Sequence, residues 1–434
     1  MVQDLGFSAC KQDTLPASLH NPLILNDHSP PMKIIHTSDW HLGQHFMGKT
    51  RQAEHQAFLD WLLAAAITHN ADAILVAGDI FDTGSPPSYA RELYNHFIVA
   101  LSKTGTRLII LGGNHDSVAT LGESKSLLAE LNTSVIPGVA ADAGEQVLLL
   151  RQKDGSAGAV LCAIPFIRAR DVQQSVAGQS SDEKQLSLQA GIFQHYQTLY
   201  QRALDVRNEL GLTTLPIIAT GHLTTVGASA SESVREIYVG ALEAFPTSAF
   251  PPADYIALGH IHRPQKVGGF EHIRYCGSPI PLSFDEAKQV KEVLLVSLNN
   301  EGLQAVEPLT IPRSQQLISL RGNLAELELA ISALEKNESI WLEVLVSSDD
   351  YLSDLQSRIE VLTKDTQIEV LRIRRERGNA ASTWQADSKE TLAELSPADV
   401  FAQRIASEEI EAPLLIQLEK RYAQTVTLLQ EGKA

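Results

Sequence analysis

The chain has 434 residues, of which 44% are hydrophobic and 20% charged, and its formal net charge is −17. This composition excludes a disordered, collagenous or disulfide-stapled protein. The chain is long enough for two or three domains. Such an acidic chain has no overall attraction to nucleic acid or an anionic membrane, so any DNA binding would need a local site, a metal or a partner.

Residues 1–31 contain a single lysine, several polar breaks and the Pro30-Pro31 pair. They lack the basic and then continuously apolar pattern of a signal peptide. We expect either a disordered extension or a start codon placed too early, with Met32 beginning the folded part. No apolar run approaches the ~20 residues that span a bilayer. The three scattered cysteines favour a reducing compartment, so the sequence predicts a cytoplasmic protein.

From Met32 onward, short apolar runs alternate with helical patterns. Continuous apolar runs, typical of strands buried on both faces, occupy 33–36, 73–77, 107–111, 160–163, 216–220 and 255–258. Apolar residues at every third or fourth position predict helices over 53–68, 89–101 and 192–210. This order predicts a layered α/β domain over residues 32–285, with functional side chains gathered at the carboxyl ends of the strands.

The pattern changes after residue 285. Further strands are predicted over 290–298, 316–320, 339–346 and 367–374, and helices over 323–335 and 351–363. This order suggests a ferredoxin-like α+β capping domain over residues 286–378. Residues 379–434 would form a polar linker and apolar-striped helices at 399–404 and 413–431. These helices would either dock a partner protein or pack back on their own domain.

Polar, chemistry-bearing turns follow five of the predicted strands. They contain Asp39 and His41; Asp79 and Asp82; Asn114, His115 and Asp116; His222; and His260 and His262. Taken singly, each turn could be a capped turn or a surface histidine, but five such strand ends together predict a metal centre. Mixed imidazole and carboxylate ligands suit Mn²⁺, Fe²⁺ or Zn²⁺. Seven ligands are too many for one tetrahedral zinc and suit two octahedral ions that share a carboxylate.

This series of turns resembles the calcineurin-like metallophosphoesterase superfamily. More narrowly, the sequence around it is similar to the nuclease subunits of bacterial complexes that pair a nuclease with a coiled-coil ATPase. The stretches that carry this similarity are 38–43, 78–84, 113–117, 259–264 and 275–279. The resemblance runs from Met32 to near the C-terminus. It implies a layered β-sandwich flanked by helices, a smaller capping domain and C-terminal helices.

The resemblance also implies a role for each site residue. Asp39, His41, Asp79 and His262 would hold the first metal, and Asp79 would bridge to a second, which Asn114, His222 and His260 would complete. His115 would lie over the phosphate as a catalytic residue. Asp116 would orient His115, or else cap a loop. Mn²⁺ is the expected metal, and Asp82 receives no role from the resemblance.

The implied function is a Mn²⁺-dependent DNA nuclease in repair, recombination and replication. It would act as a 3′-to-5′ exonuclease on duplex ends and as an endonuclease on single strands and hairpins. The resemblance also implies a homodimer that works with a coiled-coil ATPase. This chain has no Walker A motif, so we do not expect it to hydrolyse ATP itself. The alternatives are an esterase of small phosphodiesters and a non-catalytic, metal-bound scaffold. Arginines at 168, 170 and 372–377 could contact phosphates or lie on a solvated face.

Overall fold

The computed structural model describes residues 30–173, 180–231, 233–234, 244–335, 337–347, 355–375, 418 and 421–422. The extension expected at residues 1–31 lies outside this part, apart from Pro30 and Pro31. The linker and the C-terminal helices expected after residue 378 also lie outside it, apart from three positions. The chain divides into two compact units at residues 376 and 377, so all of the sheets and nearly all of the described residues belong to the first unit.

Two six-stranded sheets form the main body of this unit. The first has the strand order β14-β13-β1-β4-β5-β6 and the second β11-β12-β10-β9-β8-β7. The strands of the first are β1 (Met32–Thr37), β4 (Ala73–Val76), β5 (Arg107–Leu111), β6 (Thr133–Ile136), β13 (Glu292–Asn299) and β14 (Gly302–Thr310). The strands of the second are β7 (Val147–Arg151), β8 (Ala157–Cys162), β9 (Ile217–His222), β10 (Tyr255–Gly259), β11 (Gln265–Val267) and β12 (Phe270–Tyr275). All six strands predicted before residue 285 are confirmed.

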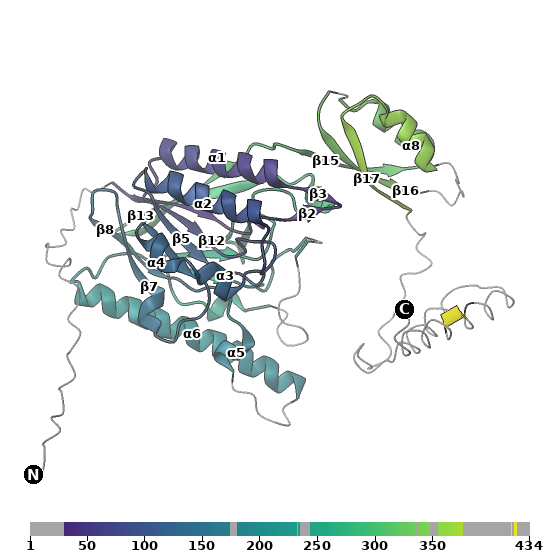
Figure 1. Ribbon diagram of the computed structural model, residues 1–434. Helices are drawn as coiled ribbons and strands as arrows, with labels where there is room; N and C mark the ends of the chain where they lie inside the picture. Colours follow the sequence, from purple (N-terminus) through teal and green to yellow (C-terminus); the bar gives the residue numbers. More distant parts are fainter. Residues whose placement is uncertain are drawn as a thin grey trace, which may run out of the picture. The chain divides into compact units, whose positions relative to one another are not determined.

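The two sheets pack face to face, and helices cover their outer faces (Figure 1). Side chains alternate between the faces of a strand, so Ile34 of β1 faces the core between the sheets while Ile35 packs with α1 and α2. The helices α1 (Gln52–Thr68) and α2 (Ser88–Ser102) cover the first sheet, and α6 (Ser181–Glu209) covers the second. The predicted layered β-sandwich flanked by helices is therefore confirmed.

Short elements complete the main body. They are β2 (His45–Phe46), β3 (Lys49–Thr50), α3 (Val118–Gly122), α4 (Lys125–Ala129), α5 (Ala169–Val172) and the 3-10 turns η2 (Ala143–Gln146), η3 (Thr247–Ala249) and η4 (Phe284–Glu286). No helix within the described ranges is both long and apolar enough to cross a membrane.

The boundary predicted at residue 285 does not match the sheet pairing. The strand expected to open the capping domain is β13, which pairs antiparallel with β1 and thus lies in the first sheet of the sandwich. Its neighbour β14 was not predicted. β13 is buried along most of its length, as a central strand is, and therefore shows an apolar run. β14 is an edge strand that mixes apolar with polar residues and is only partly buried, so it shows no such run.

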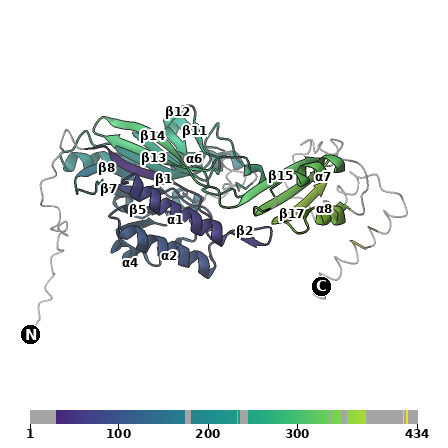
Figure 2. The ribbon, with the colours of Figure 1, turned by 90° about the horizontal axis from the view of Figure 1, so that it is seen from above.

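A separate three-stranded sheet follows, with the order β15-β16-β17. It comprises β15 (Gln316–Gly322), α7 (Leu324–Ser332), β16 (Ile340–Val346), α8 (Leu355–Thr363) and β17 (Ile368–Arg375) (Figure 2). Both strand pairs are parallel, so the ferredoxin-like arrangement predicted from the element order is wrong. The first strand that was predicted for this domain is β13, which belongs to the sandwich. The remaining elements form two overlapping β-α-β units, in which α7 and α8 each return the chain to the end of the sheet where the preceding strand began.

The small sheet is buried on both faces. Ile340 and Leu342 of β16 face the core formed with α7 and α8. Trp341 points to the opposite face, where it packs with Phe46 of the β2-β3 hairpin and Phe284 of η4. The small sheet therefore contacts the main body through an aromatic cluster.

Candidate metal centre

The predicted ligands come together at one edge of the sandwich, where parallel strands of both sheets end. Within each of two groups, the ligand atoms lie within 4.8 Å of one another. The first group is Asp39, His41 and His262, and the second is Asp79, His222 and His260; all six are buried. These two groups agree with the two sets of ligands that the family resemblance implies, and a third group of the same kind joins His41 with Asp82 and His115.

Asp79 and Asn114 join the two groups. Asp79 Oδ2 lies 3.6 Å from His41 Nε2 on one side and 3.2 Å from His222 Nε2 on the other. The side chain of Asn114 lies beside the second group, with its Oδ1 2.8 Å from His222 Nε2. All seven predicted ligands are thus adjacent, and Asp79 has the central position that a bridging carboxylate requires.

The turns that carry these ligands adopt unusual backbone conformations. Positive φ angles occur at Asp39 (53°), His41 (46°), Asp79 (51°) and His260 (94°). Such a conformation costs about 1–3 kcal/mol at a residue other than glycine and persists only where surrounding structure imposes it. Hydrogen bonds supply that restraint, because Asp39 N donates to the Gly78 carbonyl and His41 N to the Asp79 carbonyl.

The charges within the site are strongly coupled. Burial alone would raise the pKa of Asp79, but the charge and hydrogen bond of His222 hold it well below its usual value. Burial would lower the pKa of His222, yet the charge of Asp79 raises it to about 9. Burial and the charge of His222 together lower the pKa of His260 well below its usual value. Asp79 is therefore kept as an anion and His260 as a neutral ring, the forms that bind a cation, whereas His222 would release a proton when a cation binds.

The ring nitrogens provide a test of whether a metal fits. Nε2 of His41 and Nε2 of His260 are buried and have no hydrogen-bond partner among the described residues. A buried polar atom without a partner is costly. Imidazole nitrogens that face carboxylates, as here, form the donor set of a transition-metal site, so the residues present fit divalent ions.

His115 and Asp116 do not form the pair that the sequence suggested. His115 Nδ1 lies 2.7 Å from the main-chain carbonyl oxygen of Asp82. The carboxylate of Asp116 instead accepts hydrogen bonds from the backbone N–H groups of Ile80, Phe81 and Gly113, at 2.8–3.1 Å. Asp116 thus connects two ligand-bearing turns, in agreement with the alternative loop-capping role. Burial and the nearby charge of Asp79 raise its pKa to about 6.

Sequence reasoning named Asp82 without a role and missed two other polar residues around the ligands. Asp82 Oδ1 lies 3.2 Å from His41 Nδ1. Ser233 Oγ lies 2.6 Å from His262 Nδ1, and Glu286 Oε1 lies 3.5 Å from the same nitrogen. No motif contains Ser233 or Glu286, because the fold alone brings them to His262.

The arginines differ in their relation to the site. Arg168 donates to the Asp116 carbonyl oxygen at 3.1 Å and lies over the ring of Phe166. Arg170 is largely exposed. Arg372 and Arg374 of β17 form ion pairs with Glu343 on the neighbouring strand β16, so these two arginines of the predicted run are engaged within the small sheet.

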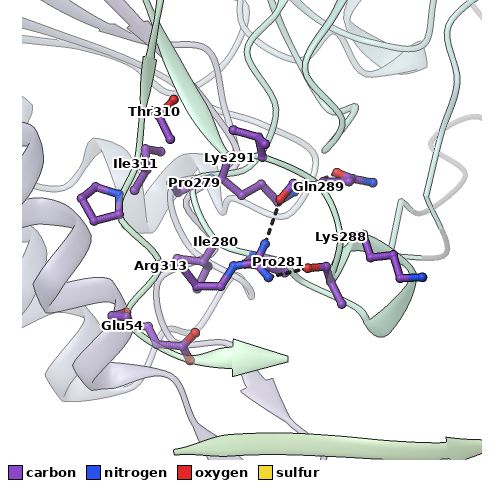
Figure 3. A pocket seen from close by; sticks show the side chains of 14 residues that line it. Glu54, Pro279, Ile280, Pro281, Lys288, Gln289, Lys291, Thr310, Ile311 and Arg313 are labelled. Carbon is purple, nitrogen blue, oxygen red and sulfur yellow. Dashed lines mark hydrogen bonds between the residues drawn. The ribbon is translucent and has the colours of Figure 1, made fainter. Parts of the chain in front are cut away.

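A cavity of about 530 Å³ lies next to this region but contains none of the predicted site residues. Figure 3 shows Arg313 extending across it, with hydrogen bonds from its guanidinium to the carbonyl oxygens of Ala287 and Gln289. Lys291 lines the cavity, and its Nζ also donates to the carbonyl oxygen of His262 at 2.9 Å. Lys291 therefore contacts both the cavity and the backbone of His262.

Comparisons with known proteins agree with this geometry. The model of the calcineurin-like phosphoesterase family matches residues 32–264, and that of the type 5 capsule protein repressor C-terminal domain matches residues 313–409. The chain is 51% identical to the SbcD subunit of nuclease SbcCD from Escherichia coli (strain K12), over 93% of its own length and 100% of that protein. The proteins of the same name from Rhodobacter capsulatus and Bacillus subtilis (strain 168) are 34% and 32% identical. These matches cover 67% and 61% of this chain and 71% and 66% of the respective relatives.

Proposed function

The chain belongs to the calcineurin-like phosphoesterase family and, within it, to the family of SbcD nuclease subunits; from this premise we propose that it is a Mn²⁺-dependent DNA nuclease. As a member of this family it is a metal-dependent phosphodiesterase. The observation that carries the proposal is that two groups of buried candidate ligands meet at Asp79, which contacts His41 of the first group and His222 of its own.

The proposed ligands of the first ion are Asp39, His41, Asp79 and His262. Those of the second are Asp79, Asn114, His222 and His260. When bound, two divalent ions with a shared carboxylate supply an activated water nucleophile and charge that stabilises the phosphoryl oxygens. Burial of six of these side chains supports the assignment, because little solvent competes for the cations.

The proposed catalytic residue of the chain itself is His115. A carbonyl oxygen can only accept a hydrogen bond, so the contact with Asp82 fixes the proton on Nδ1 of His115. Nε2 is then the nitrogen that acts on substrate. In the doubly protonated ring, Nε2 would hold the second proton near the phosphate, stabilise negative charge and give that proton to the leaving oxygen, which leaves the neutral Nδ1–H ring. We propose that Asp116 acts indirectly, by holding the 79–81 and 113–116 turns together.

DNA is the proposed substrate because the curated relatives of this chain are named as nucleases and the similarity extends beyond the phosphoesterase domain. The proposed activities are 3′-to-5′ exonuclease action on duplex ends and endonuclease action on single strands and hairpins, in repair, recombination and replication. The net charge of −17 gives no general affinity for DNA. We therefore propose a cytoplasmic assembly in which a homodimer of this chain joins SbcC-type coiled-coil ATPases that contribute DNA binding and control access.

An end-labelled hairpin DNA tests the proposal. The metal-stripped chain alone, given Mn²⁺, should cut in the loop or in single-stranded regions, and EDTA should stop the reaction. Cleavage of a nitrophenyl phosphodiester without cleavage of DNA, with or without the ATPase, would instead identify an esterase of small diesters. Binding of Mn²⁺ without cleavage of either substrate, again with or without the ATPase, would identify a scaffold.

A further inference from the structure

A hydrogen-bonded chain of side chains reaches Nδ1 of His262. His262 Nδ1 is 2.6 Å from Ser233 Oγ. The hydroxyl of Ser233 donates in turn to Glu286 Oε1. Ser231 Oγ also donates to Glu286 Oε1, at 2.7 Å. Ser233 is thus the residue that connects the imidazole of His262 with the buried carboxylate.

The chemistry of these groups fixes the direction of the hydrogen bonds. An ionised carboxylate only accepts, so the single hydroxyl proton of Ser233 is directed to Glu286. The oxygen of Ser233 must then accept from His262, which places the imidazole proton on Nδ1. The lone pair of the ring is consequently on Nε2, the nitrogen that remains for the first group of ligands.

Glu286 is itself held in place. Its side chain is fully buried, and Oε2 accepts hydrogen bonds from Lys291 Nζ at 2.6 Å and from the backbone N–H of Leu282 at 3.1 Å. The Lys291 ammonium also donates to the carbonyl oxygen of His262 at 2.9 Å. The buried ion pair of Glu286 and Lys291 therefore restrains both the backbone and the ring of His262.

We propose that Ser233 and Glu286 are positioning residues that hold His262 in the Nδ1–H tautomer, with Nε2 directed to the first metal. This inference rests on the proposed function, since it assigns His262 to a metal site. A hydrogen-bond partner of this kind fixes the orientation of a histidine ligand and raises its basicity, and its loss lowers metal affinity by about 10- to 100-fold.

Ser233→Ala tests the relay with little change in volume, and Ser231→Ala is its matched control. Both serines contact Glu286, but the contact with His262 Nδ1 is made by Ser233. Isothermal titration calorimetry of the full-length chains with Mn²⁺ measures the affinity for each ion. Ser233→Ala should bind one of the two ions about 10- to 100-fold more weakly than the parent chain. Binding by Ser231→Ala should stay within about 3-fold of the parent chain. Equal affinities in Ser233→Ala and Ser231→Ala would overturn the proposal.

A spectroscopic measurement separates positioning from a purely structural role. With ¹⁵N-labelled histidine, the His262 ring of the parent chain should give the nitrogen shifts of the Nδ1–H tautomer at a pH where the ring is neutral. Ser233→Ala and Glu286→Gln should give a mixture of tautomers. The double variant Glu286→Gln, Lys291→Met avoids an unpaired buried lysine and should show the same mixture. An unchanged Nδ1–H signal in these folded variants would overturn the proposal.

The same titration distinguishes this inference from the proposed function. If the parent chain binds no Mn²⁺, the proposed metal centre is wrong. If the parent binds two ions and Ser233→Ala binds both with unchanged affinity, the metal centre stands and the positioning role is wrong.

Discussion

His115 lies beside the ligands, and its Nδ1 is directed to the Asp82 carbonyl oxygen. Substitution His115→Ala should therefore lower the rate of DNA cleavage by about 10²- to 10⁴-fold, the usual contribution of a general acid or base. The Mn²⁺ content should remain that of the parent chain. Rapid-quench assays with matched metal analysis check both values, and cleavage at the parental rate would remove His115 from the mechanism.

His36 offers a second prediction at the scale of single residues. This ring is fully buried, with Nδ1 2.9 Å from the hydroxyl of Tyr255, and burial lowers its pKa to about 3. The unfolded chain protonates this histidine near pH 6.5, so between about pH 6 and 4 the unfolded state binds the additional proton. Stability should accordingly fall as the pH falls through this window, by about 1.4 kcal/mol per pH unit from this residue.

Urea unfolding of the metal-free chain between pH 6 and 4 measures this contribution. The variant His36→Asn should reduce the slope of unfolding free energy against pH by about 1.4 kcal/mol per unit. His45→Asn changes an exposed histidine of β2 and should leave the slope unchanged. Equal slopes for His36→Asn and the parent chain would show that His36 is protonated in the folded protein.

At the scale of elements, the two sheets lie so close together beside the ligand-bearing turns that Gly259 has no room for a side chain. A Cβ atom on Gly259 would lie 1.9 Å from the Ala77 carbonyl oxygen, which accepts the hydrogen bond of His222 Nδ1. Gly259→Ala should therefore separate the ends of β4 and β10, destabilise the fold by about 3 kcal/mol or more, and weaken Mn²⁺ binding. Gly84→Ala, whose Cβ would make an ordinary 3.4 Å contact, should leave both unchanged. Normal metal binding by Gly259→Ala would contradict this explanation.

The aromatic cluster between the small sheet and the main body gives a prediction about docking of elements. Trp341 stacks on Phe46, with ring centroids 5.9 Å apart, and the buried guanidinium of Arg51 lies over both rings. Trp341→Ala should lower the free energy of unfolding by about 3–5 kcal/mol, measured in urea. Leu329→Ala, at a largely exposed position of α7, should change it by less than about 0.5 kcal/mol. A change below about 1 kcal/mol for Trp341→Ala would show that this cluster contributes little.

The sequence predicted the strands that are buried along nearly all of their length. The buried strands β1, β4, β5, β9 and β10 show continuous apolar runs, and the ligand turns follow directly from their ends. Pairing between distant segments was not predictable in this way. The apolar run of β13 fits either a small domain or the sandwich, and only its pairing with β1 decides between them. For the same reason Glu286, distant from His262 in sequence, could not be recognised as its neighbour.

At the scale of the whole molecule, the site depends on both halves of the sandwich. Asp39, Asp79 and Asn114 follow strands of the first sheet, whereas His222, His260 and His262 lie at the end of or just after strands of the second. On the proposed assignment neither sheet alone supplies all the ligands of either ion, so the metal centre would form only when both sheets pack together. Metal binding should in turn stabilise the folded chain, because ions that bind the folded state alone shift the unfolding equilibrium.

Anomalous X-ray scattering from crystals of the Mn²⁺-loaded chain tests the central claim most directly. We expect two peaks about 3.5–4 Å apart. One peak should lie against Asp39, His41 and His262, the other against Asn114, His222 and His260, with Asp79 between them. A single peak, or two peaks without Asp79 as a shared ligand, would contradict the account.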